Sequence, residues 1–253
     1  FLRRLLMIEV GERFSRKDVE SSVENITAVL SNIGYAFANV SPRPTLDRAN
    51  QEVELNFFVE PCQRVYVRRI EFQGNDQSKD EVLRREMRQF EGSWFSQALL
   101  DRSKIRIERL GFFDNVNIET EPVDGSEDQI DITVSVEETP SGNFQVGLGY
   151  SQIQGLIASV SVEQNNFLGS GRQVGFSVSR SSILSQIGVN YTNPYYTDDG
   201  VSRGFFLRYT EFDQGDANIS SFSTSQAAGG VSFGFPLTEL DFLRVGASAQ
   251  RID

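Results

Sequence analysis

The sequence has no histidine and only one cysteine, Cys62, among its 253 residues. Without histidine the chain cannot form Cys/His zinc sites or the catalytic triads that depend on an imidazole. A single cysteine cannot form a disulfide within the chain. No nucleophile–base pair and no glycine-rich phosphate loop is present either. The sequence therefore predicts a protein that is not an enzyme and that uses no metal and no cofactor.

Long apolar segments are also absent. No run of about 18–20 apolar residues occurs, which excludes a transmembrane helix. The net charge of −11 and the pI of about 4.7 argue against nucleic acid as a partner. The mean hydropathy of −0.31 suits a soluble protein. It also allows a membrane β-barrel, because barrel strands alternate apolar and polar residues and average out on a hydropathy scale.

Composition changes near residue 138. Charged residues are dense before this point, whereas Gly, Ser, Phe, Val and Asn dominate after it. Residues 137–142, Glu-Glu-Thr-Pro-Ser-Gly, have the composition of a short linker. The sequence thus predicts a charged part that ends near residue 139 and a second part that starts at residue 143.

The charged part contains an internal repeat. Residues 53–60 match 130–137 and Gly34 matches Gly111 at an offset of 77, whereas Gly11 matches Gly92 at an offset of 81. The difference is about one helical turn, so the helix of the first copy should be one turn longer. A match that survives such an insertion indicates a true repeat.

Each copy follows the pattern β-α-α-β-β, and the first copy lacks the opening strand, so we expect the chain to begin inside a domain. Ser15 and Ser96 are candidate N-caps of the matching helices, and Gly111 is a candidate helix stop. The elements predicted for the second copy are a strand over 65–72, a helix over 79–90, a helix after Ser96 with the apolar face Leu99, Leu100, Ile105, Ile107 and Leu110, and strands over 115–121 and 130–137.

From residue 143 onward, apolar and polar residues alternate with a period of two, which indicates strands with one apolar face. The polar face is rich in Gly, Ser, Gln and Arg, and aromatic residues gather near strand ends, as in a transmembrane barrel. These features favour a barrel over a soluble sandwich. If the repeats are periplasmic, the longest connection, 211–226, is extracellular. The seven predicted strands are 144–151, 156–163, 174–179, 187–192, 205–210, 231–235 and 243–250.

Bacterial barrels have even strand numbers and must close, because an open edge in lipid leaves backbone groups unpaired. Seven strands are therefore expected to be part of a larger barrel.

Four motifs resemble the BamA family of outer-membrane protein assembly factors. They are Val-Leu-Arg-Arg-Glu-Met-Arg-Gln at 82–89, Arg-Leu-Gly-Phe-Phe at 109–113, Asn-Phe-Leu-Gly-Ser-Gly at 166–171, and the segment 192–202. The resemblance covers almost the whole chain. It implies α+β POTRA repeats followed by the N-terminal strands of an antiparallel transmembrane β-barrel. The implied domains are an N-terminally truncated penultimate POTRA domain over 1–62, the last POTRA domain over 63–139, and an incomplete barrel over 143–253.

The resemblance also implies the location and the function. The barrel would lie in the outer membrane of a Gram-negative cell, with the POTRA domains in the periplasm. The protein would fold β-barrel clients and insert them into that membrane without ATP or a cofactor. Its partners would be unfolded clients, outer-membrane lipid and the lipoproteins of the BAM complex.

The first barrel strand would be a lateral gate. Glycine weakens strand pairing, which suits a gate. From the residues alone, however, the two glycines of this strand, Gly147 and Gly149, fit a simpler role in packing or curving the sheet. The gate residues implied by the resemblance are Phe144, Gln145, Val146, Gly147, Leu148, Gly149 and Tyr150.

By the same resemblance, Arg84, Arg88 and Glu91 would bind the lipoprotein BamD. A charged helix end of this kind is usually an ordinary solvated surface. Two other functions remain open, a protein exporter of the two-partner secretion type and a passive porin, although the attached repeats argue against a porin. The resemblance concentrates the expected function at the junction near residues 139–143.

Overall fold

The computed structural model describes residues 2–213, 223–239 and 241–253, and it divides into two compact units. The first unit comprises residues 1–74, 86–109 and 113–137, and the second comprises 75–85, 110–112 and 138–253. Helix α2 (Asp80–Arg84) and residues 110–112 therefore group with the strands of the second half of the chain. Within the described residues, no helix is both long and apolar enough to cross a membrane.

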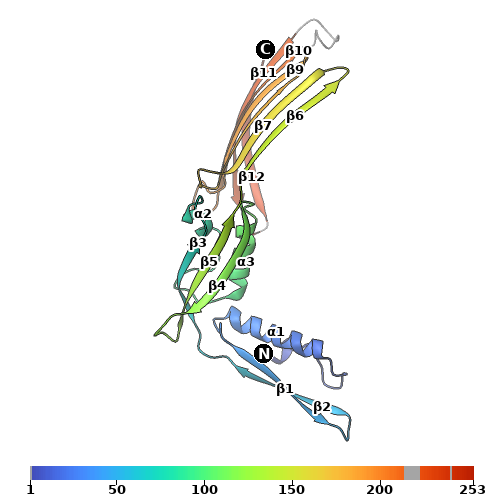
Figure 1. Ribbon diagram of the computed structural model, residues 1–253, viewed down its shortest axis with the longest axis vertical. Helices are drawn as coiled ribbons and strands as arrows, with labels where there is room; N and C mark the ends of the chain where they lie inside the picture. Colours follow the sequence, from blue (N-terminus) through green and yellow to red (C-terminus); the bar gives the residue numbers. More distant parts are fainter. Residues whose placement is uncertain (1, 214–222, 240) are drawn as a thin grey trace. The chain divides into compact units, whose positions relative to one another are not determined.

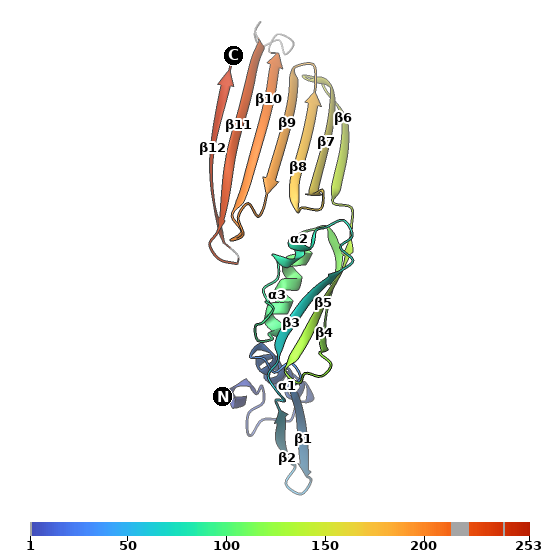
Figure 2. The ribbon, with the colours of Figure 1, turned by 90° about the vertical axis from the view of Figure 1, so that its left-hand side faces the viewer.

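The second repeat forms a three-stranded sheet in the order β3-β5-β4 (Figure 2). Its strands are β3 (Tyr66–Gln73), β4 (Phe113–Pro122) and β5 (Gln129–Glu138), and β3 runs parallel to β5. The central strand β5 buries its alternating Ile130, Ile132 and Val134 completely. Helix α3 (Gln97–Glu108) packs against β4. The predicted order β-α-α-β-β is confirmed.

The first repeat contains the short helix η1 (Leu2–Leu5), helix α1 (Arg16–Asn32) and the antiparallel strands β1 (Asn39–Asp47) and β2 (Glu52–Glu60). Its small core is centred on Ile26, Leu30 and Val40. Ser15 caps α1, because its hydroxyl accepts a hydrogen bond from the Asp18 N–H. Helix α1 has 17 residues and α3 has 12, which confirms the prediction of a longer first helix.

Three predictions for the second repeat are wrong. The helix predicted over 79–90 ends at Arg84, because the following segment is held by tertiary contacts: the Arg88 N–H donates to Ser103 Oγ, and the buried Gln89 side chain bonds to the backbone of Trp94 and Ser96. Ile105 is exposed and does not belong to the buried face of α3.

The third concerns the cap of α3. Ser96 occupies the N-cap position, but its side chain makes no capping hydrogen bond. Instead, Asn32 Oδ1 accepts the Ala98 N–H at 2.8 Å. Asn32 is the last residue of α1, so the first repeat supplies the acceptor that caps the helix of the second.

The remaining strands form one antiparallel seven-stranded sheet (Figure 1), as predicted. Its strands follow one another in sequence order from β6 to β12 (Figure 2). The predicted connection 211–226 is shorter at both ends, because β10 reaches Asp213 and β11 begins at Ser223; the rest of it lies outside the described residues. The strands are β6 (Gly142–Ser151), β7 (Gly155–Phe167), β8 (Arg172–Arg180), β9 (Leu184–Asn193), β10 (Ser202–Asp213), β11 (Ser223–Pro236) and β12 (Phe242–Ile252).

The strand register gives this sheet one apolar and one polar face. An apolar row crosses it through the paired residues Val146, Val160, Val178, Ile187 and Tyr209. The next row is polar and contains Gly147, Ser159, Ser179, Gln186 and Thr210. Many large side chains of the apolar face are exposed, and a face of this extent suits contact with lipid.

Candidate functional site

The base of the sheet is the end at which β6 begins and β7 and β9 end. It is fastened to the segment that precedes α2, within the second unit. The Glu138 carboxylate accepts the N–H groups of Gln77 (2.8 Å) and Ser78 (2.7 Å). The next amide, that of Lys79, donates to the Gly169 carbonyl at 2.9 Å. Three consecutive amides are thus bound by residues next to the strands, and we call these contacts the basal clamp.

The turn between β7 and β8 completes the basal clamp. Asn166 is buried; its Nδ2 donates to Ser78 Oγ, and its Oδ1 accepts the Gly171 N–H, both at 2.7 Å. Gly169 has a φ of +66°, and a Cβ at this position would collide with the carbonyl oxygen of Gln77. The close approach of this turn to the backbone of residues 77–78 therefore explains Asn166 and Gly169 in the Asn-Phe-Leu-Gly-Ser-Gly motif.

The linker that leads into β6 is held by hydrogen bonds on both sides. The Thr139 N–H donates to the Phe112 carbonyl at 3.1 Å. The Ser141 carbonyl accepts the Asn165 N–H at 3.0 Å, and its hydroxyl accepts Gln164 Nε2 at 2.7 Å. The entry to β6 is thus fixed in place, although its Pro/Gly composition alone suggests only a short linker.

Strand β6 pairs on one side only within the described residues. Its ten residues pair with β7, from Gly142 opposite Gln164 to Ser151 opposite Gly155. The predicted gate residues all lie on this strand. Phe144, Val146, Leu148 and Tyr150 form its exposed apolar face, whereas Gln145, Gly147 and Gly149 lie on the other face.

The two glycines of β6 differ in their surroundings. A Cβ at Gly147 would lie 2.5 Å from Ser159 Oγ, so packing against β7 accounts for this glycine. A Cβ at Gly149 would meet no atom within 4 Å. Within the described residues packing gives no reason for glycine at position 149, so the physical effects left to this residue are weaker strand pairing and curvature of the sheet.

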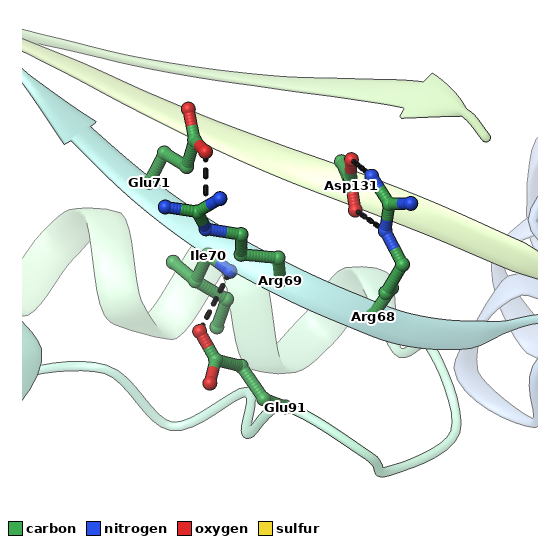
Figure 3. A network of polar contacts seen from close by, with 6 residues as sticks. All are labelled: Arg68, Arg69, Ile70, Glu71, Glu91 and Asp131. Atoms are coloured by element: carbon green, nitrogen blue, oxygen red, sulfur yellow. Dashed lines mark hydrogen bonds and ion pairs between the residues drawn. The ribbon is translucent and has the colours of Figure 1, made fainter. Parts of the chain in front are cut away.

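The three residues predicted to bind a partner are placed as follows. Arg84 lies at the end of α2, half exposed, and its Nε donates to Asp80 Oδ2 at 3.1 Å. Arg88 donates from its Nη1 to the Met87 carbonyl at 3.3 Å. Glu91 is exposed, and its Oε1 accepts the Ile70 N–H at 2.8 Å (Figure 3).

The role of Glu91 in the sheet was not predicted. The segment after it lies along the outer edge of β3, where Val67 exchanges backbone hydrogen bonds with Gly92 and Ser93. The Glu91 carboxylate extends this pairing to Ile70. Also on β3, the Arg68 guanidinium donates two hydrogen bonds to the Asp131 carboxylate (Figure 3). These hydrogen bonds hold the pKa of Asp131 below its usual value.

Family descriptions match most of the chain. The POTRA family, described as a surface antigen variable number repeat, matches residues 1–62 and 65–139, and the Omp85 superfamily domain matches residues 166–253. The chain therefore belongs to the POTRA family, and its sheet carries an Omp85 superfamily domain.

Particular relatives narrow this class to BamA-like proteins. The outer membrane protein assembly factor BamA of Neisseria meningitidis is 32% identical over 99% of this chain and 32% of its own length. BamA of Buchnera aphidicola is 30% identical over 87% of this chain and 36% of its own length. The crystal structure of Haemophilus ducreyi BamA lacking POTRA domains 1–3 matches with 33% identity and a TM-score of 0.85, over 99% of this chain and 48% of that one.

These matches confirm the predicted resemblance to BamA, the fold class, and the outer-membrane location with periplasmic POTRA domains. The chain spans about one third of the length of the curated relatives that it matches. CdiB of Escherichia coli, at 16% identity and a TM-score of 0.53, shares the fold alone. The domain ranges 1–62, 63–139 and 143–253 and the site residues stay predictions.

The basal clamp makes a testable prediction at Gly169. Gly169→Ala combines the strain of a positive φ with a backbone collision, whereas Gly125→Ala has the strain alone, because open space surrounds Gly125 at its φ of +81°. We expect Gly169→Ala to lower the free energy of local opening at residues 77–79 by about 2 kcal/mol. Their amides should then exchange roughly 30-fold faster. Hydrogen exchange at these amides measures this. Unchanged exchange in Gly169→Ala, as expected of Gly125→Ala, would contradict the clamp.

Proposed function

We propose that this chain belongs to a machine that folds β-barrel proteins and inserts them into the bacterial outer membrane, with β6 as the lateral gate. The observation that carries the proposal is a strand with an anchored base and a glycine, Gly149, that no packing contact within the described residues requires. The names of the BamA relatives, which describe outer membrane protein assembly, support the general activity.

The physical basis is the cost of bringing a strand into lipid. Each unpaired backbone group in the hydrocarbon region costs several kcal/mol, so a client strand needs a partner before it enters. An existing edge can supply that partner by β-augmentation. In a complete barrel, β6 would pair with the last strand. Weak pairing near Gly149 would let a strand of the client displace the last strand from β6. The basal clamp would keep β6 attached at its start during this exchange.

We further propose that the POTRA repeats bind unfolded clients and BAM lipoproteins, and that Arg84, Arg88 and Glu91 contact BamD. Arg84 and Glu91 are both exposed, so each charge is accessible to a partner. That the protein is not an enzyme and needs no cofactor or metal remains part of this proposal. The alternative, an exporter of the two-partner type, rests on the fold shared with CdiB and would pass its substrate through the lumen.

The gate predicts unequal effects of valine at the two glycines of β6. Gly149→Val has room for its side chain and raises strand propensity, which spans about 1 kcal/mol, so we expect client insertion to slow about fivefold in a barrel of unchanged stability. Gly147→Val collides with Ser159 and should lower stability instead. Insertion of a client into liposomes by the complete protein, alongside thermal unfolding, measures both effects. A normal insertion rate in Gly149→Val would count against the gate.

Partner binding makes a separate prediction at Glu91. Glu91→Gln keeps an oxygen that can accept the Ile70 N–H but removes the charge. If the charge contacts BamD, affinity should fall roughly tenfold, as for the loss of one charge-assisted hydrogen bond. Titration of BamD against the complete protein measures the affinity, and amide exchange at Ile70 reports whether the local structure persists. Full affinity in Glu91→Gln would remove Glu91 from the interface.

A further inference from the structure

Arg203 is a cation on the apolar face of the sheet, at its base. It lies at the start of β10, where it pairs in register with Asn193 of β9 and Phe233 of β11. Alternation along β10 puts its side chain on the same face as Phe205 and Leu207, which contact lipid in an outer-membrane barrel. A charge in this position normally reaches toward the polar edge of the membrane.

Two aromatic rings fix the position of the Arg203 guanidinium. Its Cζ lies 3.7 Å from the centroid of the Tyr196 ring and 5.1 Å from that of Phe205. The Tyr196 ring in turn meets Phe233 edge to face at 6.4 Å. Such contacts hold a guanidinium without neutralising its charge. Aromatic residues of this kind mark the level of the lipid headgroups.

The guanidinium has hydrogen-bonding capacity to spare. Its Nε is buried and has no hydrogen-bond partner, and no carboxylate forms an ion pair with Arg203 anywhere in residues 2–213, 223–239 and 241–253. A buried donor left unpaired is costly. A guanidinium offers five donors in a fork that matches two oxygens of a phosphate group.

A shallow apolar groove lies farther along the same face. It has a volume of about 430 Å³ and exists because Ala227 and Gly229 are small where their neighbours are large. Leu207 of the groove is four residues from Arg203, or about 13 Å along the strand. One leaflet contributes about half of a hydrocarbon core of ~30 Å, so an acyl chain anchored at Arg203 would reach the groove. The groove-lining residues on this face are Ile187, Val189, Leu207, Tyr209, Ala227 and Gly229.

We propose that Arg203 binds the phosphate group of a membrane phospholipid and that one acyl chain of this lipid lies in the groove. The Arg203 guanidinium supplies the positive charge that complements a phosphate group. Tyr196 and Phe205 orient this guanidinium. The groove selects a ligand with a hydrocarbon chain. The site depends on the outer-membrane location of the sheet and not on client insertion. Its test is therefore independent of the test of the gate.

Lipid retention by the complete, detergent-solubilised protein tests this site. Binding is measured for phosphatidylglycerol, for diacylglycerol with the same chains, and for inorganic phosphate. We expect tight binding of phosphatidylglycerol alone and about fivefold weaker binding in Arg203→Gln, the effect of one basic residue near a lipid surface. Arg203→Lys should fall between the two, because it keeps the charge but lacks the fork.

Arg244→Gln is the matched control. Arg244 lies at the same end of the sheet, but its register opposite Gly234, and through it Ser202, puts it on the polar face. This variant should bind phosphatidylglycerol as the unmodified protein does. Circular dichroism checks that each variant keeps its strands.

Three results would overturn the proposal. The first is unchanged lipid binding in Arg203→Gln, and the second is a loss of lipid binding in Arg244→Gln equal to that in Arg203→Gln. The third is binding of inorganic phosphate at Arg203 as tight as that of the lipid, which would show a site for free phosphate. A fourth variant, Ala227→Leu, fills the groove and should also weaken lipid retention. Full retention in that variant would remove the acyl chain from the site.

Discussion

Hydrogen bonding of the backbone in lipid is the constraint on which this structure depends. A strand in the hydrocarbon region has no water to satisfy its N–H and C=O groups, so each strand must pair on both sides. The inner strands β7 to β11 meet this condition within the described sheet. Among the described residues strand β6 meets it on one side only, so in lipid its outer edge requires a further strand. In the proposed function that strand is alternately part of the same barrel and part of a client.

The basal clamp gives the edge a fixed origin. Glu138, the last residue of β5, binds the amides before α2, and Asn166 and Gly169 bind the same segment from the turn between β7 and β8. Both ends of the linker to β6 are therefore anchored by residues of the second repeat and of the sheet. In the proposed function, these hydrogen bonds at the base would let the pairing along β6 change without detachment of the strand from the repeat.

Patterns that arise from local chemistry were predictable, and features that arise from tertiary contacts were not. Alternation fixes both faces of each strand, so the seven strands and the exposed apolar face followed from the sequence. The offset of the repeat predicted the longer α1. In contrast, Asn32 caps a helix 65 residues away in the chain, and Glu91 bonds to Ile70 across a loop, so neither role has a local signal. Helix α2 stops early because Gln89 bonds to Trp94 and Ser96, which helical periodicity does not reveal.

A reversible cross-link between β6 and the last strand of the complete barrel tests the gate most directly. Cysteine would replace Tyr150 on β6 and its partner on the last strand, in a Cys62→Ser background because Cys62 is exposed and free. The single-cysteine variants serve as controls. The account predicts that client insertion stops when the disulfide forms and returns when it is reduced. Insertion at the normal rate with the disulfide closed would contradict the gate.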